Sequence, residues 1–193
     1  MHRDRSVAAV VLAAGASRRY GSPKQLVVVD GRTLLEHVIG AAMDAGLEPV
    51  IAVVPVWLSP LPGLDQAPAR WIWNAFPERG VSLSLRLGLG AVDSVASAAV
   101  ILLGDQPGVP PATIAAVVKA RGDRPLVAAS ADGVLAPPVL IERTHFHLAD
   151  ELTGDVGLRD LLRENPDLVT GVPVAAHAVD VDTTADLGLI GGP

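Results

Sequence analysis

The stretch Val7–Gly15, which reads VAAVVLAAG, decides the fold of this chain. It is an apolar run, β-branched in its middle, that ends in a glycine, and this is typical of a buried strand that feeds a loop. The residues that follow, Ala16–Lys24, read ASRRYGSPK and combine small side chains with basic ones. In an open α/β sheet, ligands bind beyond the carboxyl ends of the strands. The sequence therefore predicts a ligand-binding loop directly after the first strand.

Further apolar runs alternate with helical patterns along the rest of the chain. Strands are predicted over Leu26–Val29, Val50–Val54, Trp71–Trp73, Ala98–Leu103, Leu126–Ser130, Val139–Ile141 and Ala178–Val181. Helices are predicted over Thr33–Ala45, Gly80–Ser94, Pro111–Ala120 and Asp155–Asn165. Thr33 and Glu36 have the spacing of a capping box, and Gly46 is a natural helix stop. This alternation predicts an α/β fold: a single domain over residues 1–193, with a mostly parallel sheet and helices on both faces.

The composition narrows the class of protein. A chain of 193 residues, 50% of them hydrophobic and only 3% aromatic, can bury a core of Val, Leu, Ile and Ala. The net charge of −6 argues against general binding to nucleic acid or to an anionic membrane. The absence of cysteine excludes disulfides, thiolate metal sites and a cysteine nucleophile. The first apolar run is too short for a membrane span and has no cleavage region, so we expect a cytoplasmic protein.

The loop after the first strand suits a triphosphate. Its small residues let backbone amides approach phosphate oxygens, and Arg18, Arg19 and Lys24 supply positive charge. The spacing of Gly15, Gly21 and Lys24 matches neither a Walker A loop nor G-x-G-x-x-G. The chain has only two lysines, and one of them stands here. From spacing alone, ordinary solvated charges on a glycine-containing turn explain the loop equally well.

Leu12–Lys24, LAAGASRRYGSPK, resembles the signature L-A-[AG]-G-x-S-x-R-x-G-x-x-K of the molybdenum cofactor nucleotidyltransferases, which are MobA-like NTP transferases. Four later segments resemble further motifs of that family in the same order: Asn74–Arg86 (NAFPERGVSLSLR), Leu103–Pro107 (LGDQP), Gly154–Arg159 (GDVGLR) and Asp180–Leu187 (DVDTTADL). The resemblance spans nearly the whole chain. Ala14, where guanylyl enzymes have glycine, favours the cytidylyltransferase branch.

The resemblance implies a Rossmann-like fold of the nucleotide-diphospho-sugar transferase type. It implies a Mg²⁺-dependent enzyme that moves a nucleoside monophosphate, CMP from CTP, to a phosphorylated acceptor such as molybdopterin and releases pyrophosphate. GTP is the alternative donor, and a molybdoenzyme or a chaperone is a candidate partner.

The resemblance also assigns roles to particular residues. Arg19, Lys24 and Asp105 would be catalytic, and Asp105 would bind Mg²⁺ together with Asp180 or Asp182. The nucleotide would be bound by Leu12, Ala13, Ala14, Gly15, Ser17, Arg19, Lys24, Asn74, Gly80 and Ser84. The acceptor would be contacted by Gln106, Pro107 and Asp155.

Several of these residues also have a purely structural interpretation. Asp105 and Asp155 could each cap the helix that follows, and Asp180 and Asp182 could be surface charges on an edge strand. The family's G-H-P-V segment is replaced here by Ala136-Pro137-Pro138-Val139, which leaves the acceptor contact open. A guanylyltransferase, a transferase for another phosphorylated acceptor, and a non-catalytic nucleotide-binding regulator on the same fold therefore remain alternatives.

Overall fold

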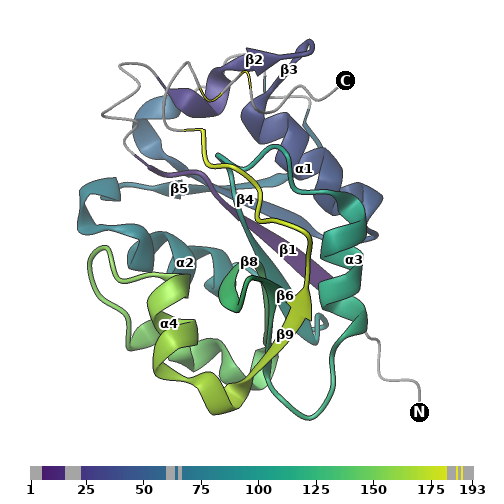
Figure 1. The fold of residues 1–193 in the computed structure, drawn as a ribbon. Helices are drawn as coiled ribbons and strands as arrows, with labels where there is room; N and C mark the ends of the chain where they lie inside the picture. The colour runs from purple at the N-terminus through teal and green to yellow at the C-terminus, as the bar shows by residue number, and fades with distance from the viewer. Residues whose placement is uncertain are drawn as a thin grey trace.

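A computed structural model describes residues 6–15, 23–59, 64, 67–181, 186 and 188 of the chain. At its centre is a seven-stranded sheet (Figure 1). In spatial order the strands are β5 (Arg70–Asn74), β4 (Val50–Pro55), β1 (Val7–Leu12), β6 (Ala98–Leu103), β8 (Val134–Glu142), β7 (Leu126–Ala131) and β9 (Val169–Pro173). The pairings between neighbours are parallel except those that β8 makes with β6 and β7. This confirms the predicted α/β fold with a mostly parallel sheet.

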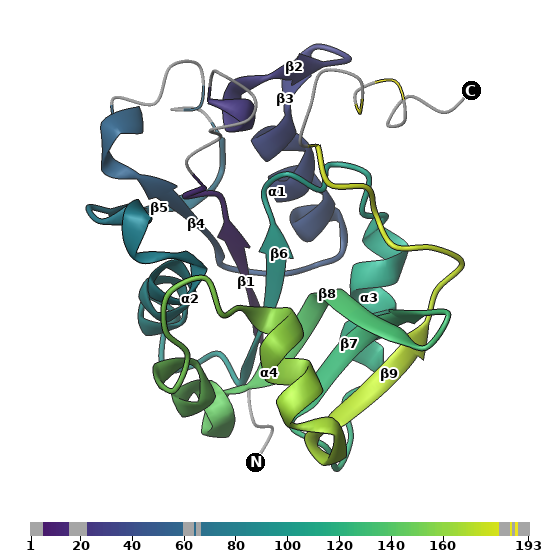
Figure 2. The same ribbon diagram turned by 60° about the vertical axis from the view of Figure 1, so that its left-hand side comes forward.

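Four α-helices cover the two faces of the sheet (Figures 1 and 2). One face carries α1 (Leu34–Asp44) and α3 (Pro111–Lys119), and the other carries α2 (Val81–Gly90) and α4 (Leu158–Glu164). Smaller elements are η1 (Lys24–Leu26), β2 (Val28–Val29), β3 (Arg32–Thr33), η2 (Val56–Leu58), η3 (Pro77–Arg79), η4 (Arg143–Asp150) and η5 (Pro166–Leu168). None of the helices in the described part of the chain is long and apolar enough to cross a membrane.

Strand β1 shows why an unbroken apolar run was needed. It pairs on both sides, with β4 and with β6, and all six of its residues are buried. Because side chains alternate along a strand, Ala9 and Val11 pack under α1 and α3, whereas Ala8 and Val10 pack under α2 and α4. A central strand of a parallel sheet therefore has no polar face, and the sequence reflects this directly.

The predicted helices are found with small shifts at their ends. In α1, the Thr33 hydroxyl accepts from the Glu36 backbone N–H, and the Glu36 carboxylate accepts from Thr33, which confirms the capping box. Helix α4 begins at Leu158 rather than at Asp155, and its N-cap is Gly157. The first turn after the N-cap is stabilised by Asp160, whose carboxylate accepts from the Gly157 backbone N–H.

The strand predictions were wrong in three places. The predicted strand Leu26–Val29 is divided between η1 and the two-residue β2, which pairs only with β3. Strand β9 was missed, because the repeated Pro and Gly around Val169–Pro173 weaken its strand pattern. The segment Ala178–Val181 contains no strand. Its Val181 backbone N–H donates to the carbonyl of Asp105, in the loop after β6, at 2.9 Å.

The carboxyl ends of the parallel strands meet at one edge of the sheet. In Figure 2 the arrows of β1 and β6 point to the same end of the molecule, and the segment that follows β9 returns to that end. Lys24 follows β1 in the chain, Asp105 follows β6, and Asp180 lies in the segment after β9. The fold therefore brings together three predicted site residues from distant parts of the sequence.

Candidate active site

An ion pair between Lys24 and Asp105 lies at this edge. The Lys24 Nζ donates to Asp105 Oδ2 at 2.6 Å, and the two side chains are 14% and 24% exposed. Lys24 begins η1 just after the predicted phosphate loop, and Asp105 follows the end of β6. A half-buried pair of this kind is less screened by water than a surface pair. The predicted phosphate-binding lysine and the predicted metal-binding aspartate are thus direct neighbours.

Asp180 joins this group through Gln106. The Gln106 Nε2 donates to Asp180 Oδ1 at 2.7 Å, and an Arg159 nitrogen lies 3.8 Å from Asp180 Oδ2. The Val181 backbone N–H donates to the carbonyl of Asp105, so the two segments that carry the aspartates run against each other. Asp105 and Asp180 therefore belong to one site, and both side chains are partly exposed to solvent.

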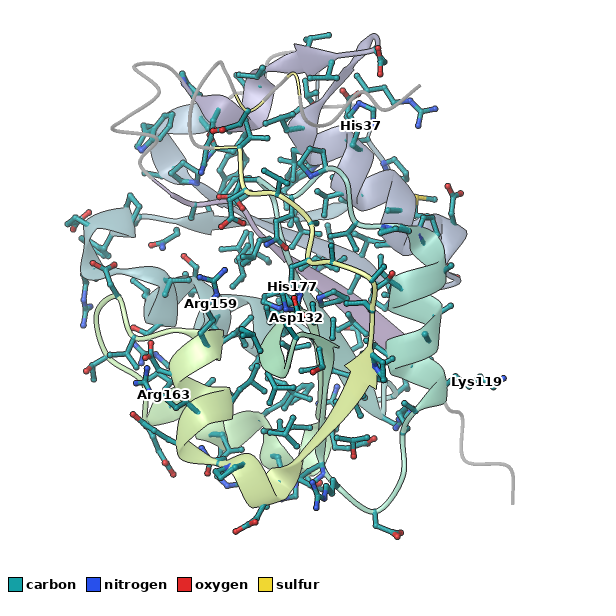
Figure 3. The ribbon with its side chains drawn as sticks, in the orientation of Figure 1. His37, Lys119, Asp132, Arg159, Arg163 and His177 are labelled. Carbon is teal, nitrogen blue, oxygen red and sulfur yellow. The ribbon has the colours of Figure 1, made fainter. Side chains whose placement is uncertain are left out.

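Arg159 extends from α4 toward the segment that follows β9, whereas the other lysine, Lys119, projects outward from the end of α3 (Figure 3). The next acidic residue, Asp160, is engaged elsewhere: it accepts from Gly157 N–H and from Arg163 at 2.7 Å. The Gly157 hydrogen bond, with a contribution from Arg163, holds the pKa of the Asp160 carboxyl below its ordinary value. Asp160 pairs with Arg163, and Arg159 lies within ion-pair distance of Asp180.

The start of the loop after β1 is held in place by a glutamine. Gln25 is 2% exposed, and its Nε2 donates to the carbonyls of Ala13 and Gly15 at 2.7 and 2.9 Å. Directly after the neighbouring strand β6, Gly104 donates its backbone N–H to the Leu12 carbonyl. A Cβ on Gly104 would lie 2.7 Å from the Cβ of Ala13, so this close approach requires glycine. The backbone of the predicted nucleotide contacts is thereby fixed from both sides.

Asn74, Gly80 and Ser84 form a buried junction. Asn74 is fully buried, donates to Ser84 Oγ at 3.0 Å, and accepts from the Phe76 backbone N–H at 2.9 Å. Gly80, with φ of 89°, packs against the backbone of Gly154, whose carbonyl accepts from the Ser82 N–H. In this structure the side chains of Asn74 and Ser84 bond to the protein itself, so their contact with a nucleotide stays a prediction.

The remaining predicted site residues are distributed as follows. Ala14 is buried and Gly15 is exposed at the end of β1, and Pro107 is half-buried beside Asp105. Asp155 is exposed in the loop before α4, where its backbone nitrogen lies against Gly80. The predicted residues Ser17, Arg19 and Asp182 lie outside the described residues.

The segment where the family motif is replaced lies beside this site. Pro137 and Pro138 line a shallow hollow together with Thr113 from α3 and His177 from the segment after β9. The His177 Nε2 lies 2.9 Å from the Val134 carbonyl at the start of β8. The segment after β9 is therefore attached both to β8 and to the loop that carries Asp105.

No role was predicted from the sequence for three residues that make contacts at this edge of the sheet, namely Gln25, Gly104 and Arg159. Each of them stands inside a family-like motif or directly after one. Their position in or next to a motif could have marked them as site residues. Their contacts could not be predicted, because each contact joins parts of the chain that only the fold brings together.

The oxygen ligands present suit a hard divalent cation. Two carboxylates, with substrate phosphates and water completing the shell, are sufficient for Mg²⁺, which retains several waters in most protein sites. Among the described residues there is no cluster of three or more His, Cys, Asp or Glu that would form an all-protein metal site. Asp105 and Asp180 supply carboxylate oxygens, which is the ligand type that such a cation prefers.

The fold and this site define an α/β protein of the nucleotidyltransferase class, with basic and acidic side chains meeting at the carboxyl edge of its sheet. Residues 9–169 match the model of the MobA-like NTP transferase domain. The chain belongs to that family.

Comparisons with individual proteins agree with this assignment. The purine catabolism protein PucB of Bacillus subtilis is 27% identical over 94% of both chains. The bifunctional enzyme IspD/IspF of Novosphingobium aromaticivorans is 35% identical over 53% of this chain, and the match spans only 24% of that enzyme. The crystal structure of Rv0371c from Mycobacterium tuberculosis is similar with a TM-score of 0.82 and 31% identity, covering 95% of this chain and 97% of that one. Rv0371c has also been solved in complex with manganese, at 27% identity, a TM-score of 0.82, and coverage of 96% and 97%.

Proposed function

We propose that this protein is a Mg²⁺-dependent nucleotidyltransferase that moves CMP from CTP to a phosphorylated acceptor such as molybdopterin and releases pyrophosphate. The observation that carries the proposal is the 2.6 Å contact between Lys24 and Asp105. It joins the residue proposed to bind phosphate to the residue proposed to bind metal, at the edge of the sheet where ligands bind. Because the donor is a cellular NTP, we propose that the protein acts in the cytoplasm.

The reaction needs no nucleophile from the protein. An oxygen of the acceptor phosphate attacks the α-phosphorus of the NTP, and the bond from that phosphorus to the bridging oxygen of the β-phosphate breaks. The electron pair leaves with pyrophosphate, and an ionised acceptor phosphate has no proton to lose. Mg²⁺ bound by Asp105 and Asp180 would neutralise phosphate charge and orient the groups.

The side chains of the site have separate tasks in this proposal. Lys24, with Arg19 from the loop, binds the triphosphate and stabilises the charge that develops at the α-phosphate and on the leaving group. The backbone from Leu12 to Gly15, fixed by Gln25, contacts the base. Arg159 lies next to Asp180. It is suited to bind the phosphate of the acceptor, because a guanidinium group can form two parallel hydrogen bonds to phosphate oxygens.

The test is a pyrophosphate-release screen of the four NTPs, with Mg²⁺, against molybdopterin and other phosphorylated acceptors. We expect release with CTP and molybdopterin that depends on both compounds. Release with GTP in place of CTP would reassign the protein to the guanylyl branch, and release with a different acceptor would replace molybdopterin. Calorimetric titration with CTP and GTP gives the base preference independently.

A non-catalytic regulator on the same fold is the second candidate. It is favoured by the replacement of the family's G-H-P-V segment by Ala136–Val139, in which Pro137 and Pro138 line the hollow described above. It predicts binding of an NTP without any release of pyrophosphate from any acceptor in the screen.

A further inference from the structure

Gln106 is a buried amide beside an exposed carboxylate. Its side chain is 2% exposed, and its Nε2 donates to Asp180 Oδ1 at 2.7 Å. Its Oε1 is also buried and has no hydrogen-bond partner among the residues that the structure describes. A buried polar atom without a partner destabilises a fold, and Gln106 offsets part of this cost through the hydrogen bond that its Nε2 donates.

Asp180 lies in a segment without regular secondary structure, outside the sheet, and its side chain is 37% exposed. A carboxylate on such a segment would rotate freely in water. The hydrogen bond from Gln106 fixes Oδ1, and the Arg159 guanidinium lies 3.8 Å from Oδ2.

The attachment to the loop after β6 is double. The Val181 backbone N–H donates to the Asp105 carbonyl, and the Asp180 carboxylate accepts from the Gln106 side chain. Two hydrogen bonds therefore join residues 180–181 to residues 105–106. Gln106 therefore orients the Asp180 carboxylate relative to the loop that carries Asp105. The burial of Gln106 also leaves little of its surface for a substrate to contact.

We propose that Gln106 is a positioning residue, which holds the Asp180 carboxylate in the orientation that a divalent cation shared with Asp105 requires. This rests on the proposed function, because it assumes that both aspartates bind the metal. The amide is the suitable group: it donates a hydrogen bond without charge, so it orients the carboxylate and leaves its negative charge available to a cation.

Two substitutions of Gln106 separate the hydrogen bond from packing. Gln106→Leu keeps a side chain of similar size but has no donor. Gln106→Glu keeps the shape but places a second carboxylate against Asp180. We expect Gln106→Leu to weaken the binding of Mn²⁺ by about tenfold. Mn²⁺ serves as the probe, and electron paramagnetic resonance detects the free ion. In Gln106→Glu the donor is lost as well, so the tight binding should not be restored.

The decisive measurement is a double-mutant cycle for Mn²⁺ affinity with Asp180→Asn. If Gln106 acts through Asp180, Gln106→Leu should have almost no further effect once Asp180 is asparagine. Asn165→Leu is the matched control, because the Asn165 amide donates to the Leu161 carbonyl on α4, a hydrogen bond that involves neither aspartate. It should change the urea midpoint without changing Mn²⁺ affinity.

The outcomes separate this inference from the proposed function. An unchanged Mn²⁺ affinity in folded Gln106→Leu, or the same loss in both backgrounds, overturns the inference alone. Mn²⁺ binding that does not depend on Asp105 overturns the metal site and the inference with it. Mn²⁺ binding that depends on Asp105, Asp180 and Gln106, in a protein that releases no pyrophosphate, supports the inference and contradicts the transferase.

Discussion

At the scale of single residues, Lys24 and Asp105 form the pair on which the site depends. Lys24→Ala removes the charge proposed to stabilise the transition state, and we expect kcat/KM to fall by about 10²- to 10³-fold, as for the loss of one preorganised donor. Asp105→Asn should cause a loss of at least similar size. Pyrophosphate release measures both. Lys119→Ala, which removes the chain's other lysine from the outer end of α3, should behave like wild type.

These residues also show how far the sequence could predict the site. The identities of Lys24, Asp105 and Asp180 came from motifs, and the structure brings those three together. The contacts that Gln106 and Arg159 make with Asp180, and those that Gln25 makes with the carbonyls after β1, could not be predicted in advance. Each of these contacts joins segments that are distant in the chain or on opposite sides of a loop, and no local pattern encodes such a meeting.

At the scale of elements, the junction between η3, α2 and the loop before α4 depends on Gly80. Gly80→Ala would place a Cβ 2.1 Å from the backbone of Gly154, at a φ of 89° that favours glycine. We expect a loss of about 2–4 kcal/mol in the free energy of unfolding, measured by urea denaturation. Gly90→Ala, at the end of the same helix with open space around it, is the control and should be neutral or stabilising by up to about 1 kcal/mol.

If Gly80→Ala is as stable as wild type, the described packing against Gly154 is not the native one.

The elements were predicted best where a residue pattern alone decides them. The capping box of α1 and the apolar strand β6 have the predicted form because their signals are local. Strand β9 was missed because its place at the sheet edge comes from pairing with β7, which overrides its weak strand pattern.

At the scale of the whole molecule, the site is assembled from the β1 loop, the β6 loop and the segment after β9. A ligand that contacts all three should stabilise the folded protein, by RT ln(1 + [L]/Kd) for one site. We expect CTP and Mg²⁺ together to raise the melting temperature more than the sum of their separate effects. Differential scanning fluorimetry measures this, and equal shifts for CTP with and without Mg²⁺ would contradict a shared site.

The Lys24–Asp105 pair has a consequence for the order in which ligands arrive. The Lys24 ammonium lies 2.6 Å from the Asp105 carboxylate that we propose as a metal ligand, so this aspartate already has a positive counterion. Free metal has to compete with that ammonium, whereas a metal–nucleotide complex brings a phosphate to receive the lysine as the metal takes the aspartate. The lysine then pairs with the phosphate and the metal pairs with the aspartate. Each charge therefore keeps a partner of opposite sign. We therefore expect free divalent ions to bind this site measurably, but more weakly than a metal–nucleotide complex, which delivers donor and metal together.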